Sequence, residues 1–441
     1  MGHKSASIAV IGAGWAGCAA ATALAGAGHT VTLLEAARVA GGRARRVEQQ
    51  GLCLDNGQHI LLGAYRDTLQ LMRTLGLAPD VLLLRLPLQM RYPAHTDGMD
   101  FIAPRLPAPL HMLWALIRAR GLQAADKLAL IRFSSAARWM DWRLNADCSV
   151  AQLLDNFGQT ERLTILLWRP LCIAALNTPP ERASANIFLH VLRDSLGAKR
   201  GASDMLLPRC DLSALLPEAA IRYIARHGGA VRYGTHVKRL AREAQTWRVQ
   251  ANDYTQQYDA VIIATPASVA ADLLAEHDAT LAAMHFDYEP ITTCYLQYPT
   301  HVKLDQPFYA LRDDPPSQQW GQFVFDRGQL AASQAGLLAV VISAASEAGA
   351  IRAAALAQAV ASQLATVLMR PELATPLWQR VITEKRATFA CTPDVARPPN
   401  TTAQPGLWLA GDYTKSHYPA TLESAVRSGL QAAALCMASL P

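Results

Sequence analysis

Three glycines near the start of the chain, followed by an acid, have the spacing of a nucleotide-binding turn. Gly12, Gly14 and Gly17 follow the pattern Gly-x-Gly-x-x-Gly, and Glu35 lies eighteen residues beyond the last glycine. Such glycines permit a tight turn, a close approach of backbone to a pyrophosphate and close packing of helix on strand. The helix N-terminus offers free N–H groups to the phosphates. The acid can accept both ribose hydroxyls, which disfavours NADP. The predicted cofactor-binding residues of this segment are Gly12, Gly14, Trp15, Ala16, Gly17, Glu35 and Ala36.

The elements that would position these residues lie in the same segment. Residues 7–11 form a short apolar run, residues 15–27 are rich in alanine, and residues 30–34 form a second β-branched run. Strand, turn, helix and strand within thirty residues predict a βαβ unit. A hydropathy window over this uncharged stretch would instead suggest a signal peptide, but the placement of the glycines favours the βαβ unit. The motif indicates a dinucleotide and does not by itself separate NAD from FAD.

Two further motifs lie near opposite ends of the chain. Gly41-Gly42-Arg43 follows the acid and could bring a second stretch of backbone, and an arginine, to the cofactor. At the other end, residues 406–410 are typical of a buried strand that ends in Gly411-Asp412, and a helix is expected from about 421 to 438. In this order the motifs resemble those of the flavin-containing amine oxidase and carotenoid desaturase superfamily.

This resemblance implies that the cofactor is FAD. It places Arg43 near the pyrophosphate, Asp412 on the ribityl hydroxyls and the backbone near Val237 against the adenine. It also directs the N-terminus of the last helix at the flavin ring, where the helix dipole would stabilise the negative charge of a reduced flavin. The cofactor-binding residues added by the resemblance are Gly42, Arg43, Val237, Gly411, Asp412, Thr421 and Leu422.

The run from Asp55 to Tyr65, with the sequence DNGQHILLGAY, narrows the resemblance. Together with residues 411–414 and 419–425 it is similar to the hydroxysqualene dehydroxylases, the squalene-associated flavoproteins of bacterial hopanoid pathways. This similarity implies that Gly57, Gln58 and His59 lie against the isoalloxazine. It also implies that the substrate is a C30 isoprenoid whose allylic hydroxyl is replaced by hydride from reduced flavin. The alternatives are a desaturase acting oxidatively on a C30 or C40 polyene, an amine or protoporphyrinogen oxidase, and a flavin-bearing scaffold subunit without catalysis.

Loss of the hydroxyl requires an acid. His59 is the predicted proton donor, because a histidine can titrate near neutral pH. The alternative is that His59 only hydrogen-bonds the flavin or a backbone carbonyl. Tyr65 and Tyr413 are further candidates, as donors or for cation–π contact with the allylic cation. Lys385 is not assigned to the catalytic set, because the sequence around it is also typical of the exposed end of a strand.

The motifs divide an α/β fold into two interleaved parts, as in amine oxidases and other GR2-type flavoproteins. Residues 1–75, 205–270 and 375–441 are predicted to form a Rossmann-like FAD-binding domain. Residues 76–204 and 271–374 are predicted to form a mixed α+β substrate domain. Within these segments we expect a helix over 212–227 and strands over 230–237, 246–251 and 258–264.

Composition limits the class of protein and its partners. Of 441 residues, 51% are hydrophobic and 17% are charged, which excludes a disordered chain. Eight scattered cysteines without CxxC or CxxH spacing disfavour a disulfide framework or a structural zinc site, so no metal is predicted. They favour the reducing cytoplasm. The net charge of +6 is concentrated in residues 101–140 without a nucleic-acid-binding pattern, so no nucleic-acid partner is expected.

Residues 109–120 are the predicted contact with a membrane. Leu110, Leu113, Trp114 and Ile117 recur at i, i+3, i+4 and i+7, and two arginines follow. A basic amphipathic helix with Trp and Leu is typical of insertion into the membrane interface, although a helix facing the core would show the same spacing. A C30 alcohol is almost insoluble, so we expect a cytoplasmic protein on the inner face of the cell membrane. Squalene-synthase-like enzymes are further candidate partners.

Overall fold

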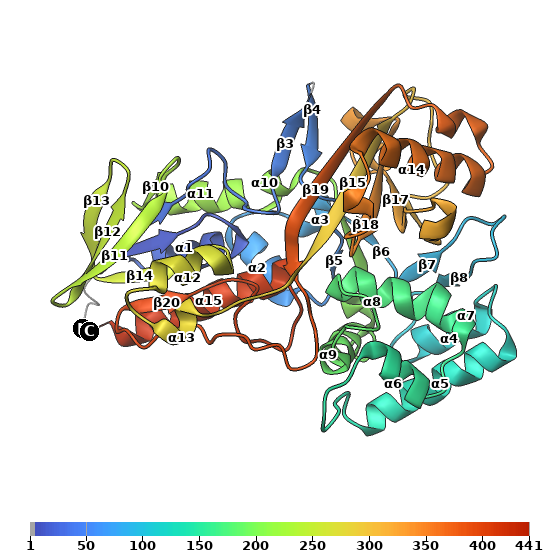
Figure 1. The fold of residues 1–441 in the computed structure, drawn as a ribbon, viewed down its shortest axis with the longest axis horizontal. Coiled ribbons are helices and arrows are strands. Elements are labelled where there is room, and N and C mark those ends of the chain that lie inside the picture. The colour runs from blue at the N-terminus through green and yellow to red at the C-terminus, as the bar shows by residue number, and fades with distance from the viewer. Residues whose placement is uncertain (1–4, 50, 441) are drawn as a thin grey trace.

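A parallel five-stranded sheet forms the centre of one of the two lobes seen in Figure 1. The computed structural model describes residues 5–49 and 51–440. Every neighbouring pair of strands in this sheet is parallel, which requires crossover connections such as helices. The strands follow the order β10 (Ala230–Arg232), β2 (Thr30–Leu34), β1 (Ser7–Ile11), β14 (Ala260–Ile263) and β20 (Leu407–Leu409).

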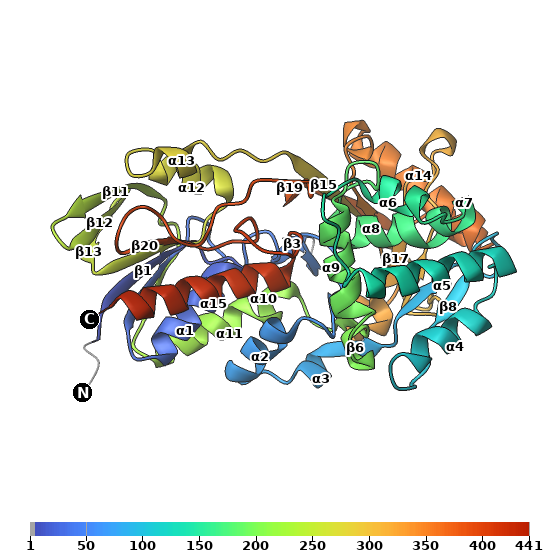
Figure 2. The same cartoon turned by 90° about the horizontal axis from the view of Figure 1, so that it is seen from below.

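Helices cover one face of this sheet, and a small antiparallel sheet lies with two short helices toward the other (Figure 2). The covering helices are α1 (Trp15–Gly26), α10 (Leu212–Leu215), α11 (Pro217–Arg226) and α15 (Leu422–Ser439). A Cβ at Gly429 of α15 would lie 2.1 Å from the carbonyl oxygen of Ala16, so α15 and α1 touch backbone to backbone. The opposite group contains β11 (Val237–Glu243), β12 (Thr246–Ala251), β13 (Thr255–Tyr258), α12 (Ala267–Leu274) and α13 (Ala279–Ala282).

An antiparallel five-stranded sheet is the centre of the second lobe. Alternate residues of its strands enter two separate hydrophobic clusters: Cys294 and Leu296 belong to the cluster with α14 (Ala353–Val367), and Tyr295 to the cluster on the other face. Both faces are therefore buried. The strands follow the order β16 (Phe308–Ala310), β17 (Phe323–Asp326), β18 (Leu337–Ser343), β15 (Tyr288–Gln297) and β19 (Trp378–Phe389).

A helical group completes the second lobe, and small sheets join the lobes. The helices are α4 (Leu110–Arg118), α5 (Ala124–Trp139), α6 (Val150–Asn156), α7 (Glu161–Leu163), a π-helical turn (Thr164–Trp168), α8 (Arg169–Leu176) and α9 (Ala185–Ser195). The joining elements are β5 (Leu61–Leu62), β9 (Met205–Pro208) and β6 (Leu83–Leu86) in one sheet, the pair β3 (Arg46–Gln49) with β4 (Leu52–Asp55), and the helices α2 (Arg66–Thr74) and α3 (Pro79–Leu82). The pair β7 (Gln89–Arg91) with β8 (Asp100–Ile102) lies within the second lobe (Figure 1). Short 3₁₀ turns lie at Arg200–Ala202, Pro315–Ser317, Arg327–Gln329, Ala332–Gln334, Ala348–Ala350 and Pro371–Ala374.

The predicted βαβ unit is confirmed, as are the strand over 246–251, the strand before Gly411 and the last helix. The helix expected over 212–227 is two helices, because Pro217 begins α11 and Leu216 before it leaves the helical conformation. The strands expected over 230–237 and 258–264 are each interrupted. In both places the chain passes between the parallel sheet and the small sheet, at Gly234 with its positive φ of 66° and at Asp259.

The strand pairing modifies the predicted division of the chain. The motifs predict that residues 375–441 belong as a whole to the FAD-binding part, whereas β19 pairs with β15 in the sheet of the second lobe. The predicted boundary at residue 270 also falls inside α12, which packs on β11. We therefore propose that the substrate part extends to the end of β19, and that the FAD-binding part includes α12 and α13.

Candidate functional site

The first wall of the site is the turn between β1 and α1. Gly12 has a φ of +102°, and a Cβ there would lie 2.6 Å from the carbonyl oxygen of Ala264, so only glycine fits. Gly14 is the N-cap of α1, and no side chain caps that N-terminus. A Cβ at Gly42 would lie 3.2 Å from the Cα of Gly14, so the two glycine loops meet backbone to backbone. The uncapped N–H groups beside this glycine cradle fit an anionic pyrophosphate.

The side chains of the next two residues of α1 face the interior. Trp15 is buried and its indole N–H donates to the carbonyl of Ala44 at 3.2 Å, which ties α1 to the second glycine loop. Ala16 is buried beneath α15. These two residues can therefore meet a cofactor through their backbone N–H groups and not through their side chains.

Glu35, the first residue after β2, joins three loops. One carboxylate oxygen accepts the N–H of Ala13 at 2.7 Å and the other accepts the N–H of Ala37 at 2.8 Å. Its carbonyl accepts the N–H of Thr235, which brings the start of β11, with the buried Val237, to the same corner. A carboxylate has about four lone-pair sites, so two remain for ribose hydroxyls. Ala36 next to Glu35 is exposed at this corner.

Arg43 and Asp412 come from opposite ends of the chain and form an ion pair. The Nη2 of Arg43 lies 2.6 Å from Oδ1 of Asp412, and Nη1 donates to the carbonyl of Ala387 at 2.7 Å. Burial lowers the pKa of Arg43, but Asp412 and nearby acidic groups outweigh it, and the net shift is upward. The guanidinium therefore stays charged and joins both glycine motifs to β19.

The N-terminus of α15 is connected to that of α2. Thr421 caps α15 by accepting the N–H of Ser424, while the N–H groups of Leu422 and Glu423 precede that capped position. The buried carboxylate of Glu423 accepts the N–H groups of Asp67 and Thr68 at 3.1 and 2.9 Å, and so caps α2. Burial raises the pKa of Glu423, although the hydrogen bonds from Thr68 oppose this shift. Glu423 thus fixes α15 relative to the residues that follow the 55–65 run.

An ion pair in the second lobe holds the 55–59 segment. Arg327 and Asp55 are both buried, with Nη2 3.9 Å from Oδ2, and the Nη1 of Arg327 donates to Oε1 of Gln58 at 2.9 Å. Asp55 also accepts the N–H of Leu212 at 2.8 Å. Burial raises the pKa of Asp55 to about 6, although Arg327 opposes the shift. Arg327 positions Gln58, a contact between residues 269 positions apart that the sequence analysis did not include.

His59 lies next to Gln58, and its environment sets its tautomer. Its Nδ1 is 2.8 Å from the carbonyl oxygen of Gly57. Because a carbonyl only accepts, Nδ1 carries the hydrogen and the Nε2 of the neutral ring is an acceptor. Burial, followed by the charge of Arg43, lowers the pKa of His59. The neutral form of His59 therefore dominates at neutral pH. Its hydrogen bond to the carbonyl of Gly57 is the backbone contact expected if His59 does not act as the proton donor. That role stays a prediction.

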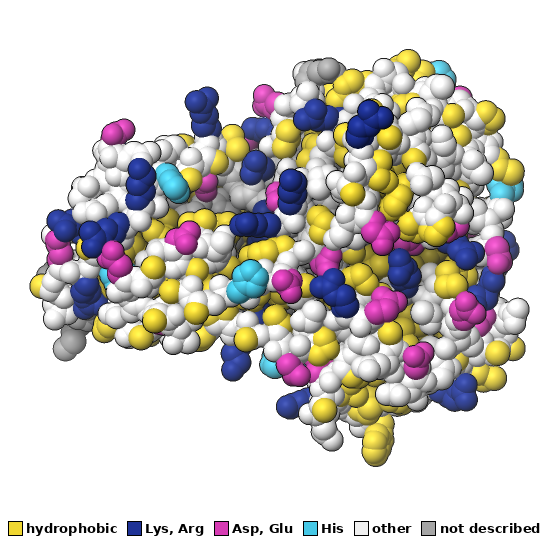
Figure 3. Space-filling model, in the orientation of Figure 1, with side chains coloured by type: hydrophobic (Ala, Val, Ile, Leu, Met, Phe, Trp, Pro, Cys, Tyr) yellow, Lys and Arg dark blue, Asp and Glu magenta, His cyan; other side chains and the backbone are white. Residues whose placement is uncertain are grey.

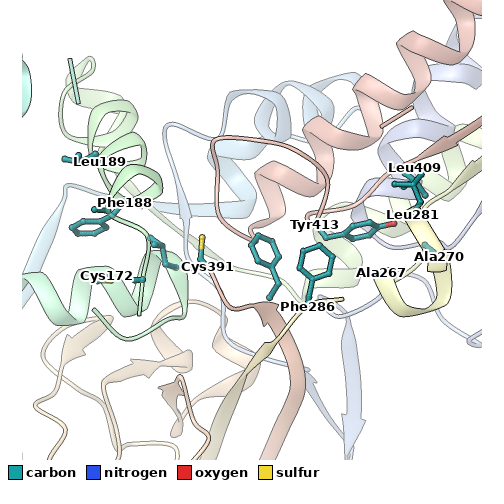
Figure 4. Packing of buried hydrophobic residues seen from close by; sticks show 14 of the residues in the cluster. Cys172, Phe188, Leu189, Ala267, Ala270, Leu281, Phe286, Cys391, Leu409 and Tyr413 are labelled. Carbon is teal, nitrogen blue, oxygen red and sulfur yellow. The ribbon is translucent and has the colours of Figure 1, made fainter. Parts of the chain in front are cut away.

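The two tyrosines of the predicted catalytic set occupy different surroundings. Tyr65 is the N-cap residue of α2, and burial raises its pKa, so the phenol keeps its proton throughout the physiological range. Tyr413 is buried in the first lobe, where its ring packs 6.1 Å from that of Phe286. Figure 4 shows its hydroxyl directed toward Leu281, and it has no hydrogen-bond partner among the described residues. The role of Tyr413 as a proton donor or in cation–π contact stays a prediction.

Thr293 of β15 is a candidate site residue that the sequence analysis missed. Its side chain is fully buried, and its hydroxyl has no partner among residues 5–49 and 51–440. The Oγ1 lies 3.9 Å from the position that a Cβ on Gly57 would occupy. A buried hydroxyl without a partner is costly, so it indicates a bound group. The unpaired hydroxyl and the bare backbone of Gly57 fit the face of a planar ring.

No group of three or more His, Cys, Asp or Glu side chains that could hold a metal ion occurs in the described part of the chain. Nor does any helix within residues 5–49 and 51–440 have the length and apolar character needed to cross a bilayer.

Comparisons with known proteins give the family. A family described as "Flavin containing amine oxidoreductase" matches residues 15–437. The chain is 29% identical to a protein of Rhodopseudomonas palustris named hydroxysqualene dehydroxylase, with 99% of each chain aligned. A protein of the same name from Sinorhizobium fredii is 28% identical, with 98% of each chain aligned.

A more distant relative and two solved structures are also similar to this chain. A 15-cis-phytoene desaturase from an Oncidium hybrid is 24% identical over 97% of this chain and 77% of its own. The crystal structure of a putative protoporphyrinogen oxidase from Exiguobacterium has a TM-score of 0.71 at 18% identity, with 98% of this chain and 99% of that chain covered. Cyclohexylamine oxidase from Brevibacterium oxydans has a TM-score of 0.69 at 18% identity, with 99% of this chain and 100% of that chain covered, and the two likenesses confirm the predicted fold.

Proposed function

The chain belongs to the flavin-containing amine oxidoreductase family and is an FAD-dependent oxidoreductase, and on this premise we propose that it reduces hydroxysqualene to squalene. The observation that carries this proposal is the similarity to hydroxysqualene dehydroxylases over 99% and 98% of both chains. The match includes the 55–59 segment, which the ion pair of Arg327 and Asp55 holds in place.

The proposed reaction exchanges a C–O bond for a C–H bond. The allylic hydroxyl takes a proton and leaves as water, and the resulting delocalised carbocation receives a hydride. FAD, when bound and reduced, supplies that hydride. The chain must therefore bind the hydroxyl, keep bulk water away from the cation and provide the proton.

The residues beside Gly57 can bind the hydroxyl. The Nε2 of neutral His59 is a hydrogen-bond acceptor, and the unpaired hydroxyl of Thr293 can donate or accept. Half-buried Ile60, Ile291 and Ile382 pack against the apolar cluster of the second lobe and would exclude water. Of the predicted proton donors, His59 must first gain a proton, whereas Tyr65 already holds one on Oη.

An anaerobic experiment tests this reaction. The FAD-loaded protein is reduced without oxygen and mixed with hydroxysqualene, while flavin absorbance and products are followed. Reoxidation of the flavin together with formation of squalene is the expected result. Reaction of only the oxidised protein with a more saturated polyene would support a desaturase, which the match to phytoene desaturase keeps as the second candidate. Tightly bound flavin without any redox change would indicate a scaffold subunit.

The exposed face of α4 supports docking on a membrane. Leu110, Leu113, Trp114 and Ile117 are 53%, 48%, 45% and 58% exposed, so the apolar stripe faces outward and the alternative of a core-facing stripe is wrong. We call these four residues the α4 face. The guanidinium of Arg118 lies 5.5 Å from the centre of the Trp114 ring. Apolar side chains flanked by positive charge suit a bilayer with anionic lipids.

The surroundings of α4 extend this apolar surface. Lys127 at the start of α5 donates to the carbonyl of Ile117 at 2.8 Å, so α5 lies against the end of α4. Leu128, Ile131 and Trp139 of α5 are also exposed. Figure 3 shows hydrophobic side chains at the edge formed by α5 and α6, whereas charged side chains cross the face between the lobes. We therefore propose that the protein docks on the cytoplasmic side of the cell membrane and withdraws its C30 alcohol from the bilayer. Squalene-synthase-like enzymes are the proposed protein partners there.

Vesicle co-sedimentation of the FAD-loaded protein tests the docking proposal. Leu113→Asp combined with Trp114→Asp should abolish most of the sedimentation with vesicles and leave FAD content unchanged, because charged side chains oppose insertion into lipid. Val81→Asp with Met369→Asp, at exposed apolar positions on α3 and after α14, is the matched control. Equal sedimentation of the parent and the α4 variant would exclude this face as the docking surface.

A further inference from the structure

An arginine-lined cavity lies at the base of α4. It has a volume of about 300 Å³ and is lined by Arg85, Pro87, Arg105, Arg200 and Asp204. Arg105 belongs to the loop that leads into α4, five residues before the first residue of the α4 face. Arg85 comes from β6, and Arg200 from the turn before β9. Residues far apart in the sequence thus bring three guanidinium groups to one cavity, and one of them comes from the loop before α4.

The charges of this cavity are organised around one carboxylate. Asp204 is buried; its Oδ2 lies 3.0 Å from Nη1 of Arg85 and its Oδ1 3.4 Å from Nη1 of Arg200. The single acid therefore orients two arginines and neutralises one charge of three. Arg105 is exposed and forms no ion pair with the described residues. The cavity keeps an excess of about two positive charges, and Arg105 has its guanidinium available for an anion.

A buried histidine provides a second, independent observation. His111, in the first turn of α4, is 1% exposed, and neither ring nitrogen has a hydrogen-bond partner within the described residues. Burial, followed by the charge of Arg200, lowers the pKa of His111, while the carbonyl of Pro107 and the carboxylate of Asp204 oppose the shift. In the same helical turn Leu110 is exposed, whereas His111 is buried. Buried polar groups without partners indicate a missing ligand or water at the site.

We propose that Arg85, Arg105 and Arg200 bind the phosphate of an anionic phospholipid headgroup while the α4 face enters the bilayer. Guanidinium groups match phosphate oxygens with paired, charge-assisted hydrogen bonds. The cavity volume reaches the lower end of the range for ligand pockets, which suits a headgroup rather than a larger molecule. Arg105 lies in the loop that leads into α4, and this link to the α4 face favours a lipid phosphate over a free one. This inference rests on the membrane docking proposed above.

The test compares full-length, FAD-loaded proteins on vesicles of phosphatidylcholine with and without phosphatidylglycerol. Arg105→Gln should lower binding to the phosphatidylglycerol vesicles about 50-fold, of which the lost charge at a membrane surface accounts for about fivefold and the lost charge-assisted hydrogen bonds to phosphate for about tenfold. Arg105→Lys should show most of the same loss in binding, because a lysine keeps the charge but lacks the planar guanidinium with its paired N–H donors. Arg352→Gln, at an exposed arginine before α14, is the matched control and should bind as the parent does.

The outcomes separate this site from the docking surface and from the reaction. Parent-like binding of Arg105→Lys would overturn the phosphate site and leave only diffuse electrostatic attraction. Equal binding of the parent to both kinds of vesicle would overturn it as well, while the α4 face would still stand. If the parent binds neither vesicle, both membrane proposals fail. None of these measurements uses turnover, so the proposed dehydroxylation is tested independently.

Discussion

Gly17→Ala tests the packing that places the N-terminus of α1 at the cofactor. A Cβ at residue 17 would lie 1.8 Å from the carbonyl oxygen of Gly12 and 3.2 Å from the Cβ of Ala264. The carbonyl would have to move by more than 1 Å to reach an allowed contact. It cannot do so easily, because the N–H of Gly12 is bound to Leu34 at 2.7 Å and its Cα packs on residue 264. The helix must therefore move away from β1.

Overpacking of this kind costs about 1–3 kcal/mol. In the protein without cofactor, movement of the helix relieves the strain, but FAD needs the helix N-terminus in place. The cost should therefore appear in binding, as an increase of about 5- to 150-fold in the dissociation constant of FAD, by the relation of about 1.4 kcal/mol per factor of ten.

The assay is titration of the deflavinated protein with FAD, followed by flavin fluorescence. Gly349→Ala is the control, because a Cβ there has no atom within 4 Å. FAD affinity and melting temperature equal to those of the parent in Gly17→Ala would refute the proposed contact between α1 and the turn.

Three further substitutions test other parts of the site. Glu35→Gln leaves one acceptor oxygen for the two N–H groups of Ala13 and Ala37, so FAD affinity should fall at least tenfold, by about 1.5–3 kcal/mol for a hydrogen bond to a charged group; unchanged affinity in the same titration would contradict the ribose assignment. Because the folded-state pKa of Asp55 is raised from 3.8 to about 6, its contribution to stability is complete below the unfolded pKa and is lost as pH rises through the folded one. Between pH 4.5 and 7 the unfolding free energy of the parent should therefore fall by about 2 kcal/mol relative to Asp55→Asn, both measured by denaturant titration with excess FAD, and parallel pH profiles would show that this carboxyl does not titrate as described. Thr293→Val removes an unpaired buried hydroxyl, so the melting temperature without FAD should stay the same or rise, while single-turnover reduction of substrate should slow about tenfold; an equal rate would mean that the hydroxyl meets neither cofactor nor substrate.

Local patterns were sufficient to predict the nucleotide-binding elements. The glycines and Glu35 lie within one βαβ unit, where the turn, the helix start and the end of the second strand follow from neighbouring residues. Local patterns could not predict which strands pair when they lie far apart in the sequence. The sequence of β19 resembles other strands of the chain, and nothing local shows that it pairs with β15 rather than with a strand of the parallel sheet.

The residues that the sequence analysis missed act through distant contacts. Arg327 meets Asp55 and Gln58 only because the 3₁₀ turn after β17 lies against β4 and the segment after it. Thr293 is one of two adjacent threonines in β15, and only the three-dimensional structure shows that the hydroxyl of Thr292 has a partner and that of Thr293 has none among the described residues. The spacing of the α4 face predicted a helix with an apolar stripe but not the direction of that stripe, which depends on the burial of His111 and Ala115 on the opposite side.

Isotopic labelling of the product tests the central reaction most directly. The FAD-loaded protein is first reduced without oxygen in D₂O, where the transferable hydrogen of reduced flavin exchanges with solvent, and is then mixed with hydroxysqualene. The predicted product is squalene with one deuterium, on the carbon that carried the hydroxyl. Squalene without deuterium, or a product with an additional double bond and the hydroxyl retained, would contradict hydride transfer to an allylic cation in this site.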